Sequence, residues 1–383
     1  MVGNALQDLA LCLAFANPEA ELSALRARLR AGGWLPLIEL ARDLRLLPAI
    51  ATAAGAKRLT AGLPAFRLSN GQTSIPALLA DALAQHRARS AAMLARLEEL
   101  VDLFTRNGIE PILLKGARAL WTGEPDWRTL RDLDLLVLAP EADRAQALAI
   151  AAGYRTSPDY DLPLAWHHGA DLYRPDLPGW LEIHSRAGMY RADLVLPTGR
   201  LAAAAIPLAG RHGATALALP APRHVLHCLV HHHIGHRADK FGTLDIKGLY
   251  EFAADVAALD APGREELFGE AGRHPRLLAM TELWIAAAAD LFRLEAPAPF
   301  VLDADGRNRW RAIARRAATG DPPGNYDGLL EEAGMALSAN RLRRLPGGNS
   351  LAGRLRLRLR VMRSLLAPAT TQAERRRAAA LTR

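Results

Sequence analysis

Two aspartates at the head of a short apolar run constrain this chain more than any other feature. Residues 111–139 read PILLKGARALWTGEPDWRTLRDLDLLVLA, and Asp132 and Asp134 precede the run over residues 135–138. Side chains alternate between the two faces of a strand, so a strand here would place both carboxylates on one face, about 7 Å apart. The pattern therefore predicts a strand that carries paired carboxylates. The same residues would also suit a plain strand start followed by an exposed strand charge.

The residues around this pair predict a site for a metal ion and a phosphate. Two carboxylates on one face repel each other unless a cation lies between them. Mg²⁺ is the usual occupant because it binds carboxylates together with substrate phosphates. Upstream, an apolar strand over residues 109–114 leads into a Lys115-Gly116 turn and a short helix, which presents backbone N–H groups and an ammonium to a phosphate. Arg128 and Arg131 add two cations beside the acidic pair.

The segments LLKGARALW and RTLRDLDLLV resemble the uncharacterised nucleotidyltransferase family, which is related to the DNA polymerase β-type nucleotidyltransferases. That superfamily carries a Gly-Gly or Gly-Ser turn, then a strand with two acidic residues, then a third acidic residue on a later strand. The turn here is Lys115-Gly116 instead, as in this subfamily. The resemblance implies that Asp132 and Asp134 bind a catalytic Mg²⁺ or Mn²⁺, and that Lys115 and Gly116 contact the nucleotide.

The segment WLEIHS over residues 180–185 resembles the strand that carries the third acid in that superfamily. Alternation would place Glu182 and His184 on one face and the apolar side chains on the other. The resemblance implies that Glu182 is the third acid, whereas without it Glu182 would be an exposed charge on an edge strand. His184 would either orient a ligand or only satisfy a polar strand face.

A block of histidines follows over residues 223–237, which read RHVLHCLVHHHIGHR. Histidines four residues apart share a helical face, but without an acidic third ligand such a pair is weak support for zinc. Downstream, Asp245 and Ile246 resemble an Asp-Ile pair on a helix of the family. We therefore expect a helical region that closes over the nucleotide, with His231 and Asp245 in contact with it; a polar helix–helix interface is the alternative for both.

The fold is predicted to be α+β and mostly helical, with a small mixed-sheet nucleotidyltransferase core between two helical regions. Apolar residues at three- and four-residue spacing predict helices over residues 1–106, the last of them spanning about 75–106. Residues 107–200 are expected to form the α/β core, and residues 201–340 turn helical again. Residues 341–383 are expected to form a basic amphipathic tail helix.

The basic charge of the chain is concentrated in this tail. Residues 341–383 hold twelve arginines and one acid, so the rest of the chain is slightly acidic although the net charge is +8. The apolar stripe of the tail predicts a helix docked on the body with its arginines outward and residues 375–383 loose; the stripe consists of Leu355, Leu359, Met362 and Leu366. A free arm that binds nucleic acid or an anionic membrane surface is the alternative.

Composition bounds the cellular setting. Cys12 and Cys228 are the only cysteines, which excludes a disulfide framework and favours a reducing cytoplasm. The apolar run over residues 9–16 follows Asp8 and lacks a basic segment before it, so we expect a buried helix and not a signal peptide. No run approaches the ~18 apolar residues that a membrane-spanning helix needs.

These features predict a metal-dependent nucleotidyltransferase. An acceptor hydroxyl or phosphate would displace pyrophosphate from a nucleoside triphosphate, with the acids holding the metal ions, Glu182 taking the proton and basic groups neutralising the phosphates. The expected catalytic and metal-binding residues are Asp132, Asp134 and Glu182. The expected nucleotide-binding residues are Lys115, Gly116, Arg128, Arg131, His184, His231 and Asp245.

The sequence favours a small molecule, peptide or protein as the acceptor. A terminal nucleotidyltransferase acting on nucleic acid is supported by the basic tail, but the chain lacks an aromatic and basic stripe on which bases would stack. A non-catalytic nucleotide-binding protein of the same fold is a further alternative, which the complete set of acids disfavours. A metal-dependent hydrolase built on the histidine block is the fourth.

Overall fold

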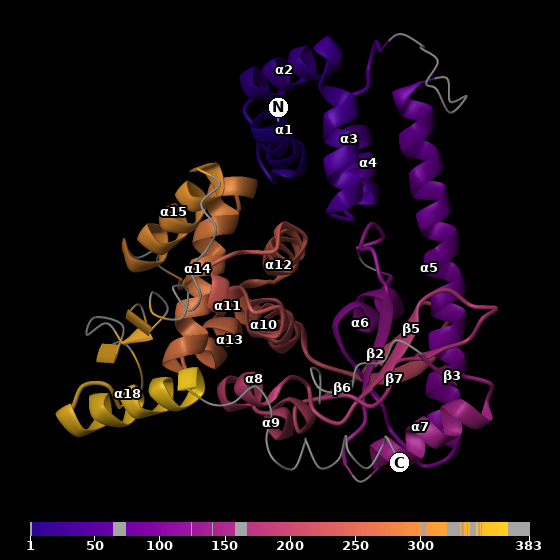
Figure 1. The fold of residues 1–383 in the computed structure, drawn as a ribbon, viewed down its shortest axis with the longest axis vertical. Coiled ribbons are helices and arrows are strands. Elements are labelled where there is room, and N and C mark those ends of the chain that lie inside the picture. Colours follow the sequence, from indigo (N-terminus) through magenta and orange to yellow (C-terminus); the bar gives the residue numbers. More distant parts are fainter. Residues whose placement is uncertain are drawn as a thin grey trace.

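The computed structural model describes residues 2–63, 74–123, 125–139, 141–157, 167–296, 298–300, 304–319 and 347–366, with short pieces between residues 330 and 345. Helices make up 64% of the structure, and the described strands form one mixed sheet. This confirms the predicted α+β, mostly helical class. In Figure 1 the sheet and a long helix lie on one side of the molecule, and the helices that follow the sheet in sequence lie on the other.

The described strands form a seven-stranded sheet in the order β3-β4-β5-β2-β1-β7-β6. They are β1 (Ile112–Leu113), β2 (Asp132–Leu136), β3 (Arg155–Thr156), β4 (Leu172–Tyr173), β5 (Trp180–His184), β6 (Ile206–Ala209) and β7 (Thr215–Ala218). The central strands β2 and β5 run parallel, and β1 runs antiparallel to β2 and parallel to β7. The alternation predicted for β2 is present, because Leu133 and Leu135 pack into one hydrophobic core and Leu136 packs into the other.

The hairpin of β6 and β7 corrects the prediction that residues 201–340 are helical throughout. These two strands pair antiparallel with each other, β7 pairs parallel with β1, and β6 forms the edge of the sheet. Their sequence, IPLAGRHGATALA, is short and rich in alanine, so no period of two marks it as strand. The pairing with β1 and the turn at Gly213, whose φ of 83° suits glycine, decide the local structure instead.

Helix α5 (Ile75–Arg106) links the N-terminal helices to the sheet and has the bounds that its apolar stripe predicted. Ser74 caps its start by accepting a hydrogen bond from the Ala77 N–H at 3.3 Å. The first turns of α5 pack against α4. The second half, from Met93 to Phe104, forms one hydrophobic core with the sheet and with α6 (Lys115–Thr122) and α7 (Glu141–Ala151).

The helices before α5 belong to a second core, which they share with the helices after the sheet. They are α1 (Val2–Leu13), α2 (Glu19–Arg28), the kinked turn η1 (Leu29–Gly33), α3 (Trp34–Asp43) and α4 (Leu47–Ala56). Gly32 has a φ of 106° and separates α2 from α3. The Phe15 N–H donates a 2.8 Å hydrogen bond to the Phe292 carbonyl, so the N-terminal helices are joined directly to α14.

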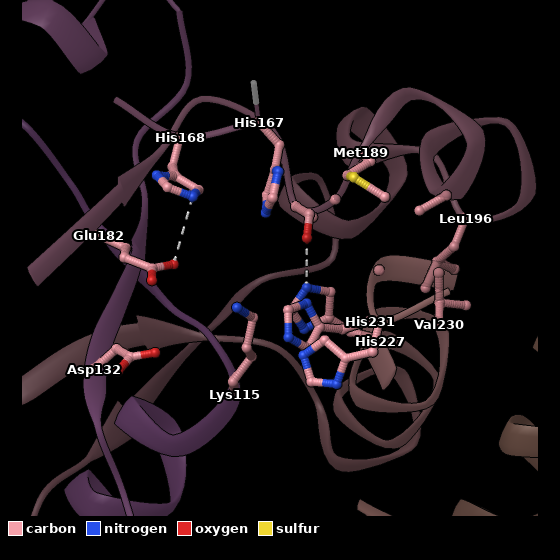
Figure 2. Close-up of a pocket in the computed structure, with 15 residues that line it drawn as sticks. Lys115, Asp132, His167, His168, Glu182, Met189, Leu196, His227, Val230 and His231 are labelled. Carbon is pink, nitrogen blue, oxygen red and sulfur yellow. Dashed lines mark hydrogen bonds and ion pairs between the residues drawn. The ribbon is translucent and has the colours of Figure 1, made fainter. Parts of the chain in front are cut away.

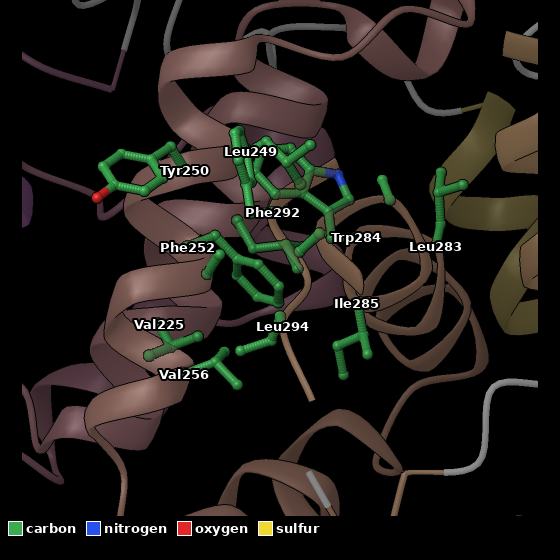
Figure 3. Close-up of a cluster of buried hydrophobic side chains, with 14 of the residues drawn as sticks. Val225, Leu249, Tyr250, Phe252, Val256, Leu283, Trp284, Ile285, Phe292 and Leu294 are labelled. Atoms are coloured by element: carbon green, nitrogen blue, oxygen red, sulfur yellow. The ribbon is translucent and has the colours of Figure 1, made fainter. Parts of the chain in front are cut away.

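The helices that follow β5 in sequence pack around aromatic side chains. They are α8 (Tyr190–Val195), α9 (Thr198–Ala202), α10 (Ala221–Val230), the π-helical turn η2 (His231–Gly235), α11 (Ala238–Phe241), α12 (Ile246–Ala258), α13 (Ala261–Ala271), α14 (Pro275–Phe292) and α15 (Ala304–Thr319). Trp284 is fully buried and lies edge-to-face on Phe252 with their ring centroids 5.5 Å apart (Figure 3). None of the described helices is both long enough and apolar enough to span a bilayer.

The last described helix, α18 (Leu351–Leu366), packs against α14 and α8. The Arg276 guanidinium on α14 donates a 3.0 Å hydrogen bond to the Ser364 carbonyl and pairs with the buried Asp239. A docked helix was predicted, but the predicted contact face was wrong. Leu355, Leu359, Met362 and Leu366 are 39–75% exposed, and the buried apolar side chains are Leu357, Val361 and Leu365.

The reason is that leucine alternates with arginine over residues 354–360 and valine continues the alternation at position 361. Such a pattern offers helical stripes on two faces, and only a partner far away in sequence, here α14, selects between them. The part of the tail that was predicted to be loose, residues 375–383, lies outside the described residues.

We expect Leu357→Ala to destabilise the protein by ~2–4 kcal/mol, because it leaves a cavity beneath α18. The matched change Leu359→Ala, at a side chain that is 62% exposed, should shift stability by less than about 0.5 kcal/mol. Thermal denaturation of the two variants measures the difference. Equal losses of stability would contradict the observed orientation of α18.

Candidate active site

The parallel pairing of β2 and β5 places two of the predicted acids side by side. Asp134 lies opposite Glu182 in the ladder, and Asp132 lies two residues earlier on the same strand. Because adjacent strands are about 4.8 Å apart, the three carboxylates occupy one small region. Figure 2 shows Asp132 and Glu182 on one side of a cavity, with the Lys115 ammonium directed toward them.

Lys115 and Gly116 form the first turn of α6, directly after β1. Lys115 has a φ of 43°, a left-handed conformation that is uncommon for a residue with a side chain and that concentrates at functional sites. A Cβ on Gly116 would lie 1.7 Å from Leu130 Cδ2, so any larger residue here would have to displace the Leu130 side chain in the loop before β2. The turn thereby directs the Lys115 side chain at the acids.

Two side chains, the Lys115 ammonium and the His184 imidazole, hold Asp134. The Lys115 ammonium lies 2.5 Å from Asp134 Oδ1, and His184 Nε2 lies 2.9 Å from the same oxygen. Burial opposes the charge of this carboxylate, but Lys115 and the hydrogen bond from His184 outweigh burial and lower the pKa of Asp134 below its ordinary value. Burial likewise opposes a charge on His184, yet its hydrogen bonds to Asp134 and Glu182 raise its pKa.

Asp132 is the carboxylate whose charge is least compensated. Burial, together with the charges of Glu182 and Asp134, raises the pKa of Asp132 to about 7. The site therefore holds more negative charge than Lys115 and His184 balance. An additional cation close to Asp132 would relieve this excess.

Three further side chains lie beside the acids and were not predicted from the sequence, namely His167, His168 and Asp171. His168 Nε2 lies 3.9 Å from Glu182, and its Nδ1 lies 3.6 Å from Asp171. His167, His168 and His184 form a ring cluster with centroids 4.8–5.2 Å apart. The only sequence signal was the adjacent pair His167 and His168 ahead of β4. Neither the spacing of apolar residues nor secondary-structure propensity predicts that this pair lies beside β5.

The donor atoms fit a divalent cation. Two sets of side chains at the acids each bring their ligand atoms within 4.8 Å of one another, namely Asp134, Glu182 and His184, and His168, Asp171 and Glu182. A third such set among the described residues, His232, His236 and Asp245, lies in the histidine block. Carboxylate oxygens with at most one imidazole suit Mg²⁺ or Mn²⁺. The uncompensated charge at Asp132 points to the same requirement.

Two cavities meet at these acids. We call the first the basic chamber; it measures about 240 Å³, and its lining includes Arg45, Arg128, Arg131, Lys247, Asp134 and Asp245. We call the second the histidine chamber; it measures about 250 Å³, and its lining includes His167, His168, His227, Glu182, Met189, Leu196 and Val230. Lys115, Asp132, His231 and His236 line both chambers. The three acids therefore lie at the junction of two different surfaces.

The histidine block forms the helical side of this junction. After α10 the chain enters the π-helical turn η2, a deviation that often marks functional sites. The rings of His231, His232 and His236 lie 4.8–5.5 Å apart. Asp245 caps α12 by accepting from the Lys247 N–H and lies 3.1 Å from His232 Nδ1. His231 lines both chambers and Asp245 lines the basic chamber, each from the helical side; their contact with a nucleotide stays a prediction.

A family model described as an uncharacterised nucleotidyltransferase matches residues 8–293. The chain belongs to this family. The match runs from α1 to the end of α14 and leaves α15 and α18 outside it. No curated protein and no solved structure matches the chain.

The two arginines predicted to bind nucleotide occupy different settings in this family member. Arg128 is buried and pairs with Asp255 at 2.8 Å and with Glu251 at 3.9 Å, both on α12. Its guanidinium therefore joins the loop before β2 to the helical side. Arg131 is exposed at the mouth of the basic chamber, where its charge is available to a ligand.

We expect Arg128→Met to destabilise the protein by ~3–5 kcal/mol, because it removes the buried guanidinium that pairs with the half-buried Asp255 carboxylate. Arg131→Met removes the same charge from an exposed position and should leave the melting temperature nearly unchanged. Chemical denaturation of both variants provides the comparison. If Arg128→Met were as stable as Arg131→Met, the ion pair with α12 would not hold the two halves of the site together.

Proposed function

We propose that this protein transfers a nucleoside monophosphate from a nucleoside triphosphate to an acceptor hydroxyl, with release of pyrophosphate and with Mg²⁺ or Mn²⁺ as cofactor. The observation that carries the proposal is the convergence of Asp132, Asp134 and Glu182 around Lys115 at the junction of two chambers. Membership of a nucleotidyltransferase family supports the reaction class.

The basic chamber suits the triphosphate. Arg45 and Arg131 are exposed cations in its lining, and Lys115 lies at its inner end. Transfer of a nucleotidyl group builds negative charge on the phosphates, so fixed cations that approach them from several sides stabilise the transition state. Lys247 pairs with Glu251 and Lys115 pairs with Asp134, both at 2.5 Å. We assign the phosphate contacts to Arg45 and Arg131, and to Lys115 because it lies beside the acids that would hold the metal.

The three acids suit the metal. Asp132, Asp134 and Glu182 would hold the divalent ion, which when bound lowers the pKa of the attacking hydroxyl and neutralises phosphate charge. His184 lies 2.9 Å from Asp134 and 3.3 Å from Glu182, so it fixes the spacing of these two carboxylates. Glu182 lines the histidine chamber, where its carboxylate would accept the proton of the attacking hydroxyl.

We expect Asp132→Asn and Asp134→Asn each to abolish transfer while the fold remains intact. The amide removes the charge of a metal ligand without opening a cavity, and this loss costs several kcal/mol of transition-state stabilisation. The measurement is pyrophosphate release from labelled nucleoside triphosphates with Mg²⁺. Asp102→Asn, at an exposed aspartate on α5, is the matched control and should keep full activity.

Near wild-type turnover of either active-site variant at saturating Mg²⁺ would remove this metal site from the mechanism. Circular dichroism of each variant checks that a loss of activity does not reflect unfolding.

We expect Lys115→Ala to raise the KM for the triphosphate more than it lowers kcat. Lys115 would contact phosphates that are present before the reaction begins, so much of its interaction is shared by the ground state and the transition state. Calorimetric titration with a non-hydrolysable triphosphate analogue measures the binding directly. Unchanged affinity would assign Lys115 to the support of Asp134 alone.

A further inference from the structure

The histidine chamber differs in charge from the basic chamber beside it. Among the described residues that line it, Lys115 is the one lysine and there is no arginine, whereas the acids Asp132 and Glu182 both reach it. A phosphate or carboxylate placed here would lie beside two carboxylates with a single ammonium to balance it. The chamber therefore disfavours a second anionic ligand next to the triphosphate.

The far end of the histidine chamber is apolar. Met189, Ala192 and Leu196 belong to or flank α8, and Val230 ends α10. Figure 2 shows Met189, Leu196 and Val230 grouped at the end opposite Asp132 and Glu182. The short helix α8 is held in place by Arg191, which lies 2.7 Å from the buried Asp239. The apolar end is thus built into the fold.

The middle of the chamber offers imidazoles that carry no charge. The His227 Nε2–H donates a 2.7 Å hydrogen bond to the Ala187 carbonyl, and burial lowers the pKa of His227 to about 4. Burial and the nearby Lys115 ammonium keep the pKa of His231 well below its ordinary value. Neutral imidazoles donate or accept hydrogen bonds from a hydroxyl without attracting an ion.

The size of the chamber limits what can enter it. A volume of 250 Å³ equals about eight water molecules at liquid density. This suits a small molecule with a reacting hydroxyl at the acids and a short apolar portion toward Leu196. A nucleic-acid strand or a folded protein would have to present such a group on a narrow extension.

We propose that the histidine chamber binds the acceptor, and that the acceptor is a small alcohol that bears an apolar portion and no anionic group. The inference rests on the proposed nucleotidyl transfer. The alcohol oxygen forms a bond to the α-phosphorus, the bond from that phosphorus to the pyrophosphate oxygen breaks, and the hydroxyl proton passes to Glu182. The products are a nucleotidylated alcohol and pyrophosphate.

The first experiment offers separate acceptor pools to the full-length protein with Mg²⁺ and the common nucleoside triphosphates labelled at the α-phosphate. The pools are neutral and cationic metabolites from a cell extract, anionic metabolites from the same extract, total RNA, and dialysed protein. We expect label to enter the neutral and cationic metabolites. Label in the anionic metabolites, RNA or protein instead would overturn the acceptor assignment and leave the proposed function standing. Absence of pyrophosphate release with every pool would remove the proposed function, and this inference with it.

The second experiment places the acceptor in the chamber. Met189→Trp fills the apolar end and should lower kcat/KM for the labelled pool on the order of tenfold, with the affinity for triphosphate unchanged by calorimetry. Met362→Trp, at the exposed methionine of α18, is the matched control and should behave as wild type. If Met189→Trp fails to fold, Leu196→Ala should instead extend acceptance to larger alcohols. Unchanged acceptor kinetics in the folded chamber variant would overturn the assignment.

Discussion

The site depends on the compensation of carboxylates that the parallel pairing of β2 and β5 forces together. Asp134 and Glu182 are opposite each other in the ladder, and burial of two like charges in this way costs several kcal/mol for each uncompensated ion. Lys115 and His184 supply opposite charge at hydrogen-bond distance from Asp134. The left-handed backbone of Lys115 serves this requirement, because it lets the turn after β1 direct the Lys115 ammonium toward β2.

Lys115 and His184 do not fully compensate the carboxylate charge, and this excess of negative charge suits the site to cation binding. Lys115 and His184 act on Asp134, whereas Asp132 keeps a raised pKa among its acidic neighbours. A protein surface that retains an excess of carboxylate charge beside an exposed basic chamber suits a divalent ion together with a polyphosphate, because each relieves the charge of the other. The histidine chamber on the opposite side lacks those basic groups among its described residues, so in the proposed reaction the acids would lie between an anionic substrate and an uncharged one.

The second wall of the site comes from helices that form their own core. Residues of η2 line both chambers, and residues of α12 line the basic chamber. Arg128 joins α12 to the loop before β2 through its ion pair with Asp255. The N-terminal helices pack into the same core as α10, α12 and α14. The position of the helical wall relative to the sheet is therefore set by Ile112, Leu114 and Leu136, which pack into this core from the sheet side, by α5, which spans both cores, and by the ion pair of Arg128.

The sequence by itself determined the features that depend on near neighbours in the chain. The period of two located β2 and β5 and the faces of their acids, the period of 3.6 set the bounds of α5, and the glycine at position 32 marked a break between helices. These features can be predicted from neighbouring residues alone, because the order of apolar and polar side chains along the chain indicates which of them are buried. Only the tertiary structure decided that Arg128, and not Arg131, forms an ion pair with α12. It also decided which apolar stripe of α18 packs against the body, and it paired β7 with β1. It also brought His167 and His168 to Glu182. Each of these outcomes depends on a partner that is distant in sequence. Where a local pattern offers two helix faces or two arginines, the pattern does not show which of the two contacts that partner.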